Sequence, residues 1–288
     1  MDQSQSRLGI AYMLGGMFLF SAVDAQAKFL TETLHPFQVV WSRHMGLVFV
    51  SLFFIARYRR RIFQSSRPGL QITRGALAAG SASLFIIAVS FVPLADAVAV
   101  SFIAPFIVTV MAALFLGESV GIRRWTAVTI GFVGALIVIR PGMGALHPAV
   151  MLVAAAAVFF ALRQIVSRVL GNDDATSTTL AYTALVGGVI LTLPLPFVWK
   201  WPSTTQEITI LISFALMAAL AETLVIKALE TAEAVVVAPI QYSLIIWGTM
   251  YGYLIFGQLP DGWTWVGTAI IIASGLYTLH REQIRKVG

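Results

Sequence analysis

Two ionisable residues stand one helical turn apart inside an otherwise apolar segment near the N-terminus. Asp24 and Lys28 lie in FSAVDAQAKF, which continues the apolar run GIAYMLGGMFLFSAV. A carboxylate and an ammonium in such a segment are costly unless each is paired or hydrated, so they normally face a bundle interior or a cavity. Lys28 is expected to extend its ammonium outward to the interface. Asp24 is then the group that needs a partner.

Four further polar side chains fall inside apolar segments and could complete such a site. Arg43 and His44 lie in the second apolar segment, where an ion pair between Arg43 and Asp24 is geometrically plausible. Arg163 and Glu222 lie in the second half of the chain, in a mirror arrangement of base and acid. Two interpretations stay open: ion pairs that lock helix packing, or the charged walls of a hydrated path.

The sequence lacks the residue patterns that are typical of an intramembrane enzyme. HExxH, a GxGD pair of aspartates and a Ser nucleophile with a partnered His are all missing. The chain has no cysteine, and its four histidines, at positions 35, 44, 147 and 280, do not have the spacing of metal ligands. We therefore expect no enzymatic activity, no metal and no cofactor.

The composition indicates an integral membrane protein. Hydrophobic residues make up 58% of the 288 residues and charged residues only 11%, with a mean hydropathy of +0.86, whereas a soluble chain is about one quarter charged. The net charge of +6 could suggest nucleic acid, but the Lys and Arg residues cluster in short loops, where they set membrane orientation. We expect a lipid bilayer as the partner and no nucleic acid.

Apolar runs long enough to span a bilayer predict an all-α membrane protein with ten transmembrane helices. The runs lie at 8–30, 36–57, 70–91, 94–117, 121–140, 146–170, 176–198, 205–229, 234–257 and 262–280. Most of the 19 Lys and Arg residues then fall on the side of the N-terminus, whereas Lys28, Arg140 and Lys200 fall on the other. This asymmetry predicts that both termini lie in the cytoplasm.

The sequence resembles itself at an offset of 140 residues, which indicates an internal repeat. The matched pairs are Phe20 with Phe160, Lys28 with Arg168, Glu118 with Gln258 and Trp125 with Trp265. The tripeptide LGE at 116–118, which ends an apolar run, matches FGQ at 256–258 in the same way. The chain therefore divides into a first repeat at 1–142 and a second at 143–288, each with five helices.

An odd number of helices per repeat has a mechanical consequence. The second repeat must enter the membrane from the opposite side, so the two repeats are inverted. Inverted repeats serve alternating access, in which two conformations open one central site to either face in turn. This predicts a transporter, in which Asp24 and Glu222 are the candidates if a proton drives transport.

The fourth and ninth predicted helices each carry a proline, Pro105 in SFIAPF and Pro239 in VAPIQYSLIIW. A proline inside a span frees a backbone carbonyl and allows a kink or local unwinding. The side chains around these two prolines are Ser101, Phe102, Gln241, Tyr242, Ser243 and Trp247. They offer hydrogen bonds and aromatic faces to a small amphipathic solute, although aromatic residues in membrane helices also simply fill space.

Two long segments carry a resemblance to a known family. They are PLADAVAVSFIAPFIVTVMAALFLGESVGIRRWTAVTIGFVGALIVIRPG at 93–142 and ALETAEAVVVAPIQYSLIIWGTMYGYLIFGQLPDGWTWVGTAIIIASGLY at 228–277. Both are similar to the paired domains of the EamA family in the drug/metabolite transporter superfamily. The resemblance implies ten helices in inverted five-helix repeats, a bacterial inner membrane and small metabolites as cargo. Gln258 departs from the family pattern, which the first half keeps with Glu118.

Family members of similar layout export aromatic and other neutral amino acids, and others move S-adenosylmethionine or riboflavin. Our hypothesis is an alternating-access exporter of neutral or aromatic amino acids, because such a solute carries both signs of charge. Transport of S-adenosylmethionine or riboflavin stays open, as does a structural or signalling role without transport. The solute contacts would come from Ser101, Phe102, Gln241, Tyr242 and Trp247, with polar or gating roles for Asp24, Arg43, His44, Arg163 and Glu222. Monomer and homodimer are equally compatible with the sequence.

Overall fold

The computed structural model describes residues 3–58, 64–117, 121–140, 147–170, 174–232 and 234–287, and every regular element within these ranges is helical. The helices of the first half are α1 (Gln3–Leu30), α2 (Pro36–Tyr58), α3 (Pro68–Val89), α4 (Leu94–Ser101), α5 (Ala104–Leu116) and α6 (Ile122–Ile139). Those of the second half are α7 (Val150–Leu170), α8 (Thr176–Thr192), α9 (Leu195–Val198), α10 (Thr205–Thr231), α11 (Ala234–Val237), the 3₁₀ helix η2 (Ala238–Tyr242), α12 (Ser243–Phe256) and α13 (Gly262–Val287). All ten predicted spans are therefore helical.

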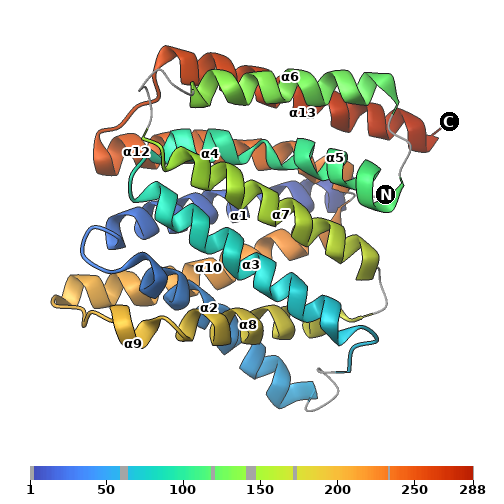
Figure 1. Ribbon diagram of the computed structural model, residues 1–288. Coiled ribbons are helices and arrows are strands. Elements are labelled where there is room, and N and C mark those ends of the chain that lie inside the picture. Colours follow the sequence, from blue (N-terminus) through green and yellow to red (C-terminus); the bar gives the residue numbers. More distant parts are fainter. Residues whose placement is uncertain are drawn as a thin grey trace.

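Length and composition mark some of these helices as membrane spans by themselves. Five segments qualify within the described residues: Gln5–Leu30, Pro68–Val89, Leu94–Leu116, Val150–Leu170 and Thr205–Leu229. Shorter apolar helices accompany them, at Trp125–Ile139 and Ser177–Thr192. The long helices lie side by side along one common direction, with both chain termini at the same end of the bundle (Figure 1). We call this end the terminal end and the opposite one the distal end.

The fourth and ninth spans are interrupted where the prolines lie. α4 ends at Ser101 and α5 begins at Ala104, directly before Pro105. In the second half, a 3₁₀ helix that contains Pro239 separates the short α11 from α12. Both spans also end alike, because Gly117 after α5 and Gly257 after α12 adopt left-handed backbone angles, with φ of 64° and 65°. Glycine is the residue that takes this conformation without strain, and it ends a helix abruptly.

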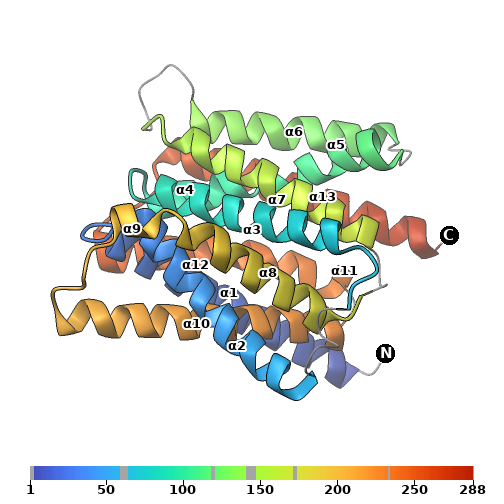
Figure 2. The ribbon, with the colours of Figure 1, turned by 60° about the horizontal axis from the view of Figure 1, so that its bottom comes forward.

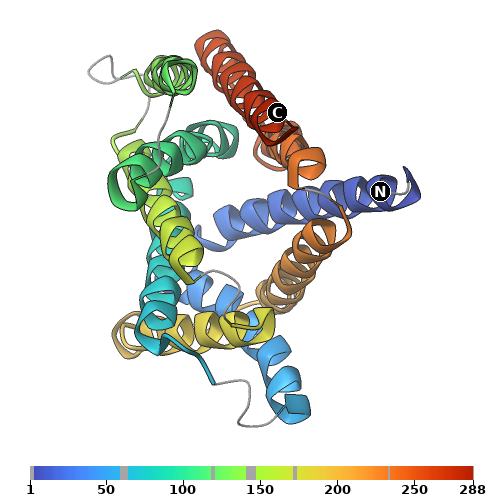
Figure 3. The ribbon, with the colours of Figure 1, turned by 90° about the vertical axis from the view of Figure 1, so that its right-hand side faces the viewer.

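The packing partners repeat when the two halves are exchanged. α1 packs on α10, and the equivalent helices α7 and α3 pack on each other (Figure 2). α2 likewise contacts α8 and α6 contacts α13, so each of these pairs joins equivalent helices of the two halves, and α4 of the fourth span contacts α12 of the equivalent ninth span. Seen from the terminal end, α6 and α13 lie at one edge of the bundle, away from α2 and α8 (Figure 3). The chain is thus an all-α membrane protein built from two inverted five-helix repeats.

Small residues allow the closest helix contacts, as is usual in membranes. α6 and α13 cross at Gly134 and Gly267, where a Cβ atom on Gly267 would lie 2.6 Å from the carbonyl oxygen of Gly134. α1 meets α10 in the same manner, because a Cβ on Gly9 would lie 2.4 Å from the Cβ of Ala232. The carbonyl oxygen of Gly134 is a backbone atom, so it cannot move aside as the tip of a flexible side chain can.

We expect Gly267→Ala to destabilise the protein by about 1–3 kcal/mol, the usual effect of overpacking, because the added methyl group meets backbone. The matched control is Gly262→Ala in the same helix, where nothing lies within 4 Å of the new Cβ. Thermal unfolding of the purified protein in detergent micelles measures both variants. Equal melting temperatures for the two would contradict the close crossing of α6 and α13.

Candidate functional site

Asp24 and Arg43 meet inside the bundle, as their positions in the sequence predicted. The Nη1 atom of Arg43 on α2 lies 3.8 Å from Oδ1 of Asp24 on α1. Asp24 is only 6% exposed, whereas the Arg43 side chain keeps 21% of its surface exposed. The guanidinium of Arg43 also lies over the ring of Phe20, 5.6 Å from its centroid. A buried carboxylate is therefore held beside a cation that still reaches open space.

Arg163 and Glu222 occupy the corresponding region of the second half. Arg163 on α7 interacts electrostatically with Glu222 on α10 and with Arg43 on α2, so the charges of both halves lie within range of one another. The guanidinium of Arg163 lies 4.8 Å from the centroid of the Phe160 ring. Its buried Nε has no hydrogen-bond partner among the described residues. That donor is available to an acceptor on a solute.

Phe20 and Phe160 make equivalent contacts with arginines in the two halves. They match each other at the offset of 140 residues, and each presents its ring to an arginine, Arg43 in one half and Arg163 in the other. A cation over an aromatic face gains about 0.5–2 kcal/mol, depending on how far it is desolvated. The rings therefore hold two guanidinium groups in place without neutralising them.

The sequence reasoning missed Arg74, which belongs to the same charged region. From the sequence it was counted only as one of the Lys and Arg residues on the side of the N-terminus, yet it lies inside α3, where its Nε donates to Ser167 Oγ at 2.8 Å and its Nη1 to Thr183 Oγ1 at 2.6 Å. Arg74 also interacts electrostatically with Arg163 and Glu222. The signal was present, because the predicted span at 70–91 already included this residue.

The residues around the two prolines form two separate aromatic pairs. The ring of Phe102 lies 4.9 Å from that of Tyr242, both residues are 9% exposed, and the Tyr242 hydroxyl fills the space beside Gly275 of α13. Trp247 instead packs edge-to-face on Phe18 of α1, with centroids 5.3 Å apart.

The polar residues of this group also differ in their surroundings. Ser101 donates to the Val98 carbonyl at 2.7 Å, which satisfies its hydroxyl within α4. Gln241 is exposed. The structure therefore does not bring the five predicted solute contacts to one place.

Unpartnered polar atoms mark the interface between α1 and α12. Ser21 Oγ, Ser243 Oγ and Trp247 Nε1 are buried and have no hydrogen-bond partner among the described residues. Ser21 lies close to Gly248 of α12, where a Cβ would be 3.7 Å from its hydroxyl oxygen. Ser21 and Asp24 are one helical turn apart on α1 and so share one face of the helix. Donors and acceptors without partners beside a charged site are typical of a surface that binds a solute or water.

His44 follows Arg43 in α2 but packs against a different helix, α8. Its ring packs against Gly187 of α8, where an added Cβ would lie 2.5 Å from the ring. Its Nδ1 lies 3.1 Å from the Val40 carbonyl oxygen, one turn earlier in the same helix. The residue is 4% exposed. The structure thus places His44 in the contact between α2 and α8.

Lys28 lies near the distal end of α1, where its ammonium has specific partners on a neighbouring helix. Its Nζ donates to the carbonyl oxygens of Val89 at 2.9 Å and Val92 at 2.6 Å. The last carbonyls of a helix lack partners within the helix, and the residue four positions after Val89 is Pro93, which has no N–H to donate to its carbonyl. Lys28 satisfies these carbonyls at the end of α3 and is 9% exposed as a result.

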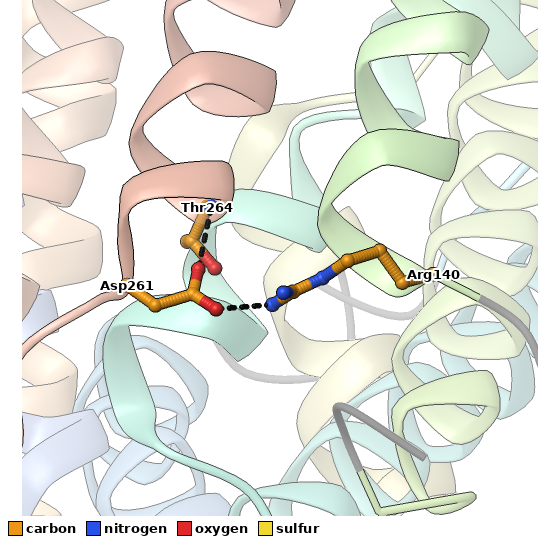
Figure 4. A network of polar contacts seen from close by, with 3 residues as sticks. All are labelled: Arg140, Asp261 and Thr264. Carbon is orange, nitrogen blue, oxygen red and sulfur yellow. Dashed lines mark hydrogen bonds and ion pairs between the residues drawn. The ribbon is translucent and has the colours of Figure 1, made fainter. Parts of the chain in front are cut away.

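Polar contacts join the two halves at both ends of the bundle. At the distal end, the Arg140 guanidinium after α6 pairs with Asp261, which also accepts a hydrogen bond from the Thr264 backbone N–H at 2.8 Å (Figure 4). Towards the terminal end, Asp174 accepts hydrogen bonds from the side chains of Ser65 and Gln71. A carrier that alternates between two open states has to break such contacts in turn.

The chain resembles known proteins along nearly its whole length. The sequence model of the EamA-like transporter family matches residues 7–140 and, a second time, residues 147–279. An S-adenosylmethionine uptake transporter from Rickettsia bellii is 28% identical over 96% of this chain and 94% of its own. A riboflavin transporter from Vibrio cholerae is 31% identical over 77% of this chain and 75% of its own.

Other matches extend the range of named cargo and support the fold. A pseudopaline exporter from Pseudomonas aeruginosa is 25% identical over 92% of this chain and 94% of its own. A crystal structure superimposes with a TM-score of 0.64 over 100% of this chain and 99% of that chain, at 15% identity. That likeness concerns the fold alone.

Because Asp24 and Arg43 form an ion pair, we expect the losses of stability caused by substituting them to be non-additive. Arg43→Gln should lower the free energy of unfolding by up to about 3 kcal/mol, because it leaves a buried carboxylate without its counter-charge. The double variant Asp24→Asn/Arg43→Gln should recover most of that loss, since it removes both charges. Melting temperatures of the wild type, the two single variants and the double variant give the interaction between the two side chains as a double-mutant cycle. Purely additive losses would show that the two side chains do not interact.

We expect the stabilising effect of the Asp261 side chain to depend on pH. The backbone hydrogen bond from Thr264 and the Arg140 guanidinium hold the pKa of this loop carboxyl below its usual value. A lowered pKa stabilises the folded state above the unfolded pKa of about 3.9 and ceases to do so as the pH falls through the folded value. Asp261→Asn should therefore melt below the wild type at pH 7, and the difference in melting temperature should shrink as the pH falls below about 3.9. A difference that stays constant as the pH is lowered would assign the loss to another cause.

Proposed function

This chain belongs to the EamA-like transporter family and is a small-molecule transporter, and from that premise we propose that it works as an alternating-access carrier of a zwitterionic metabolite. In this proposal the halves 1–142 and 143–288 exchange roles between an inward-open and an outward-open state. The repeated packing partners of the two halves support it, because exchanging the halves leaves the set of contacts nearly unchanged.

The observation that carries the substrate proposal is the mixture of charges on aromatic supports. Arg43 and Arg163 each lie over a phenylalanine ring, and both would receive the carboxylate of the solute. Asp24 and Glu222 would receive its positive groups. Arginine suits the first task because its planar fork binds a carboxylate with two parallel hydrogen bonds.

S-adenosylmethionine is the solute that we favour. It carries a carboxylate, an ammonium and a sulfonium group, together with a flat adenine that can stack on aromatic rings. The named cargo of the Rickettsia bellii relative supports this choice. Riboflavin, the named cargo of the Vibrio cholerae relative, has no carboxylate and leaves the two arginines without a partner.

Export of neutral or aromatic amino acids is the second candidate. These solutes share the carboxylate and ammonium groups, and the aromatic pairs Phe102–Tyr242 and Phe18–Trp247 would accommodate an apolar side chain. We also propose that the protein lies in a bacterial inner membrane with both termini in the cytoplasm. The excess of Lys and Arg on the side of the N-terminus supports this orientation.

Counterflow into proteoliposomes tests the proposed function. Vesicles are loaded with unlabelled solute and exposed to labelled S-adenosylmethionine, riboflavin, Phe, Trp, Thr or Met. Transient accumulation of S-adenosylmethionine is the expected result. Accumulation of the amino acids alone would select the second candidate, and accumulation of riboflavin alone would refute the charge argument. No flux of any solute would favour a structural or signalling role.

Asp24→Asn and Arg43→Gln should each lower the initial rate at subsaturating solute by about tenfold or more. Losing a hydrogen bond to a charged group costs about 1.5–3 kcal/mol, and 1.4 kcal/mol corresponds to a factor of ten. The matched control is Arg123→Gln, which removes an exposed guanidinium at the start of α6. Monodisperse elution in gel filtration shows whether each variant is folded, and loss of folding in both would assign the pair a structural role.

A further inference from the structure

A cavity opens at the distal end of the bundle, apart from the charged site. Its volume is about 480 Å³, which lies within the range of about 300–1,000 Å³ that small-molecule sites occupy. The end of α1, the turn between α3 and α4, and the end of α12 form its walls, with Lys28, Glu32, Ser90, Phe91, Phe256 and Gln258 among the lining residues. The cavity therefore combines one cation, one anion and two aromatic rings.

Lys28 keeps part of its hydrogen-bonding capacity for a ligand. An ammonium has three N–H donors, and the carbonyls of Val89 and Val92 accept two of them. Nζ also lies 5.5 Å from the centroid of the Phe256 ring. The remaining donor and the positive charge belong to a side chain that lines the cavity.

Lys28 interacts electrostatically with the carboxylates of Glu32 and Asp96, and Gln258 adds no third carboxylate beside it. The repeat aligns Gln258 with Glu118 and Lys28 with Arg168, so the second half carries a neutral amide where the first half has an acid. A carboxylate at position 258 would compete with any anionic ligand for Lys28. The amide does not, and its buried Oε1 has no hydrogen-bond partner among the described residues, so it can accept a hydrogen bond from an ammonium group.

The lining also suits the remaining parts of such a solute. Glu32 is exposed at the cavity and lies one helical turn beyond Lys28. Phe91 is 56% exposed and stacks on His147, with ring centroids 5.0 Å apart and an angle of 8° between the planes. An exposed ring that is held flat by a second one offers a stacking face to a planar group.

α1 connects this cavity with the charged site. Ser21, Asp24 and Lys28 follow one another at spacings of three and four residues, so they lie along one face of the helix. Asp24 is therefore one turn deeper in the bundle than Lys28. A solute that leaves the cavity along this face meets the carboxylate of the charged site next.

We propose that the distal cavity is a second solute site, at which Lys28 binds the carboxylate of an amino-acid-like solute, while Glu32 and Gln258 bind its ammonium group. This inference rests on the proposed function, because it takes its solute from the same class. The solute occupies the cavity before or after its stay at Asp24 and Arg43.

Cysteine labelling tests the second site directly, because the natural chain has no cysteine. Ser90→Cys places a thiol in the cavity wall, and Thr205→Cys places one at the same end on α10, away from the cavity lining. The purified variants in detergent micelles react with a maleimide, with and without S-adenosylmethionine. At a concentration about ten times the dissociation constant, labelling of Ser90→Cys should slow about tenfold by mass action, and that of Thr205→Cys should not change.

A modified ligand and further substitutions, each combined with Ser90→Cys, identify the side chains that bind the solute. Decarboxylated S-adenosylmethionine should give little protection, since it lacks the group that Lys28 binds. Lys28→Met and Gln258→Glu should abolish protection by S-adenosylmethionine, and Lys28→Arg should retain it. Asp24→Asn should retain protection as well, although it impairs transport, because the cavity binds the solute independently of the charged site.

The outcomes separate this inference from the proposed function. Counterflow of S-adenosylmethionine without protection of Ser90→Cys would overturn the second site and leave the carrier intact. Protection that survives in Lys28→Met but disappears in Asp24→Asn would also overturn it, because the thiol would then report the charged site. Protection without counterflow would support the cavity and refute the carrier of this solute. Absence of both effects would refute both proposals.

Discussion

Polar groups inside a bilayer have no water to bind, so each of them needs a partner within the protein. This constraint governs the interior of the bundle. Arg43 stands beside Asp24, Arg74 donates to the hydroxyls of Ser167 and Thr183, and Lys28 donates to the carbonyls at the end of α3. The apolar surface of the helices can face lipid only because these groups are satisfied inside.

The inverted repeat determines where the satisfied and the unsatisfied groups lie. Exchanging the halves maps the contact of α1 with α10 onto that of α7 with α3, and it maps Phe20 onto Phe160, each beneath an arginine. The charged site therefore lies between equivalent parts of the two halves. Such a position suits a carrier, because a solute there is reached from either side when the halves exchange conformations.

The two repeats differ in sequence at one end of the bundle, and the two ends of a carrier can differ in function. The first half has Glu118 where the second has Gln258, and Lys28 corresponds to Arg168. At the distal end the corner of α12 therefore carries an amide instead of an acid, in a cavity that also holds Lys28, Glu32 and aromatic rings. One face of α1 links that cavity to Asp24. The proposed solute path thus depends on a single helix and on one departure from the repeat.

The sequence by itself determined the helices, the repeat and one buried pair. Hydropathy marked all ten spans, the prolines marked the interruptions before α5 and α12, and the matched glycines marked the ends of these two helices. Asp24 and Arg43 could be paired because they lie at similar depths in adjacent helices. These features follow from the local sequence, since length, hydropathy and backbone preference are properties of neighbouring residues.

Only the tertiary structure decided which partner each side chain meets. Lys28 binds the end of α3 because free carbonyls lie beside it there, and His44 packs into a helix contact because Gly187 leaves room for its ring. Phe102 and Tyr242 met each other, whereas Gln241 and Trp247 went elsewhere. The physical reason is that a side chain's surroundings depend on which helix faces meet, and hydropathy, which is high around the whole circumference of these helices, does not specify that.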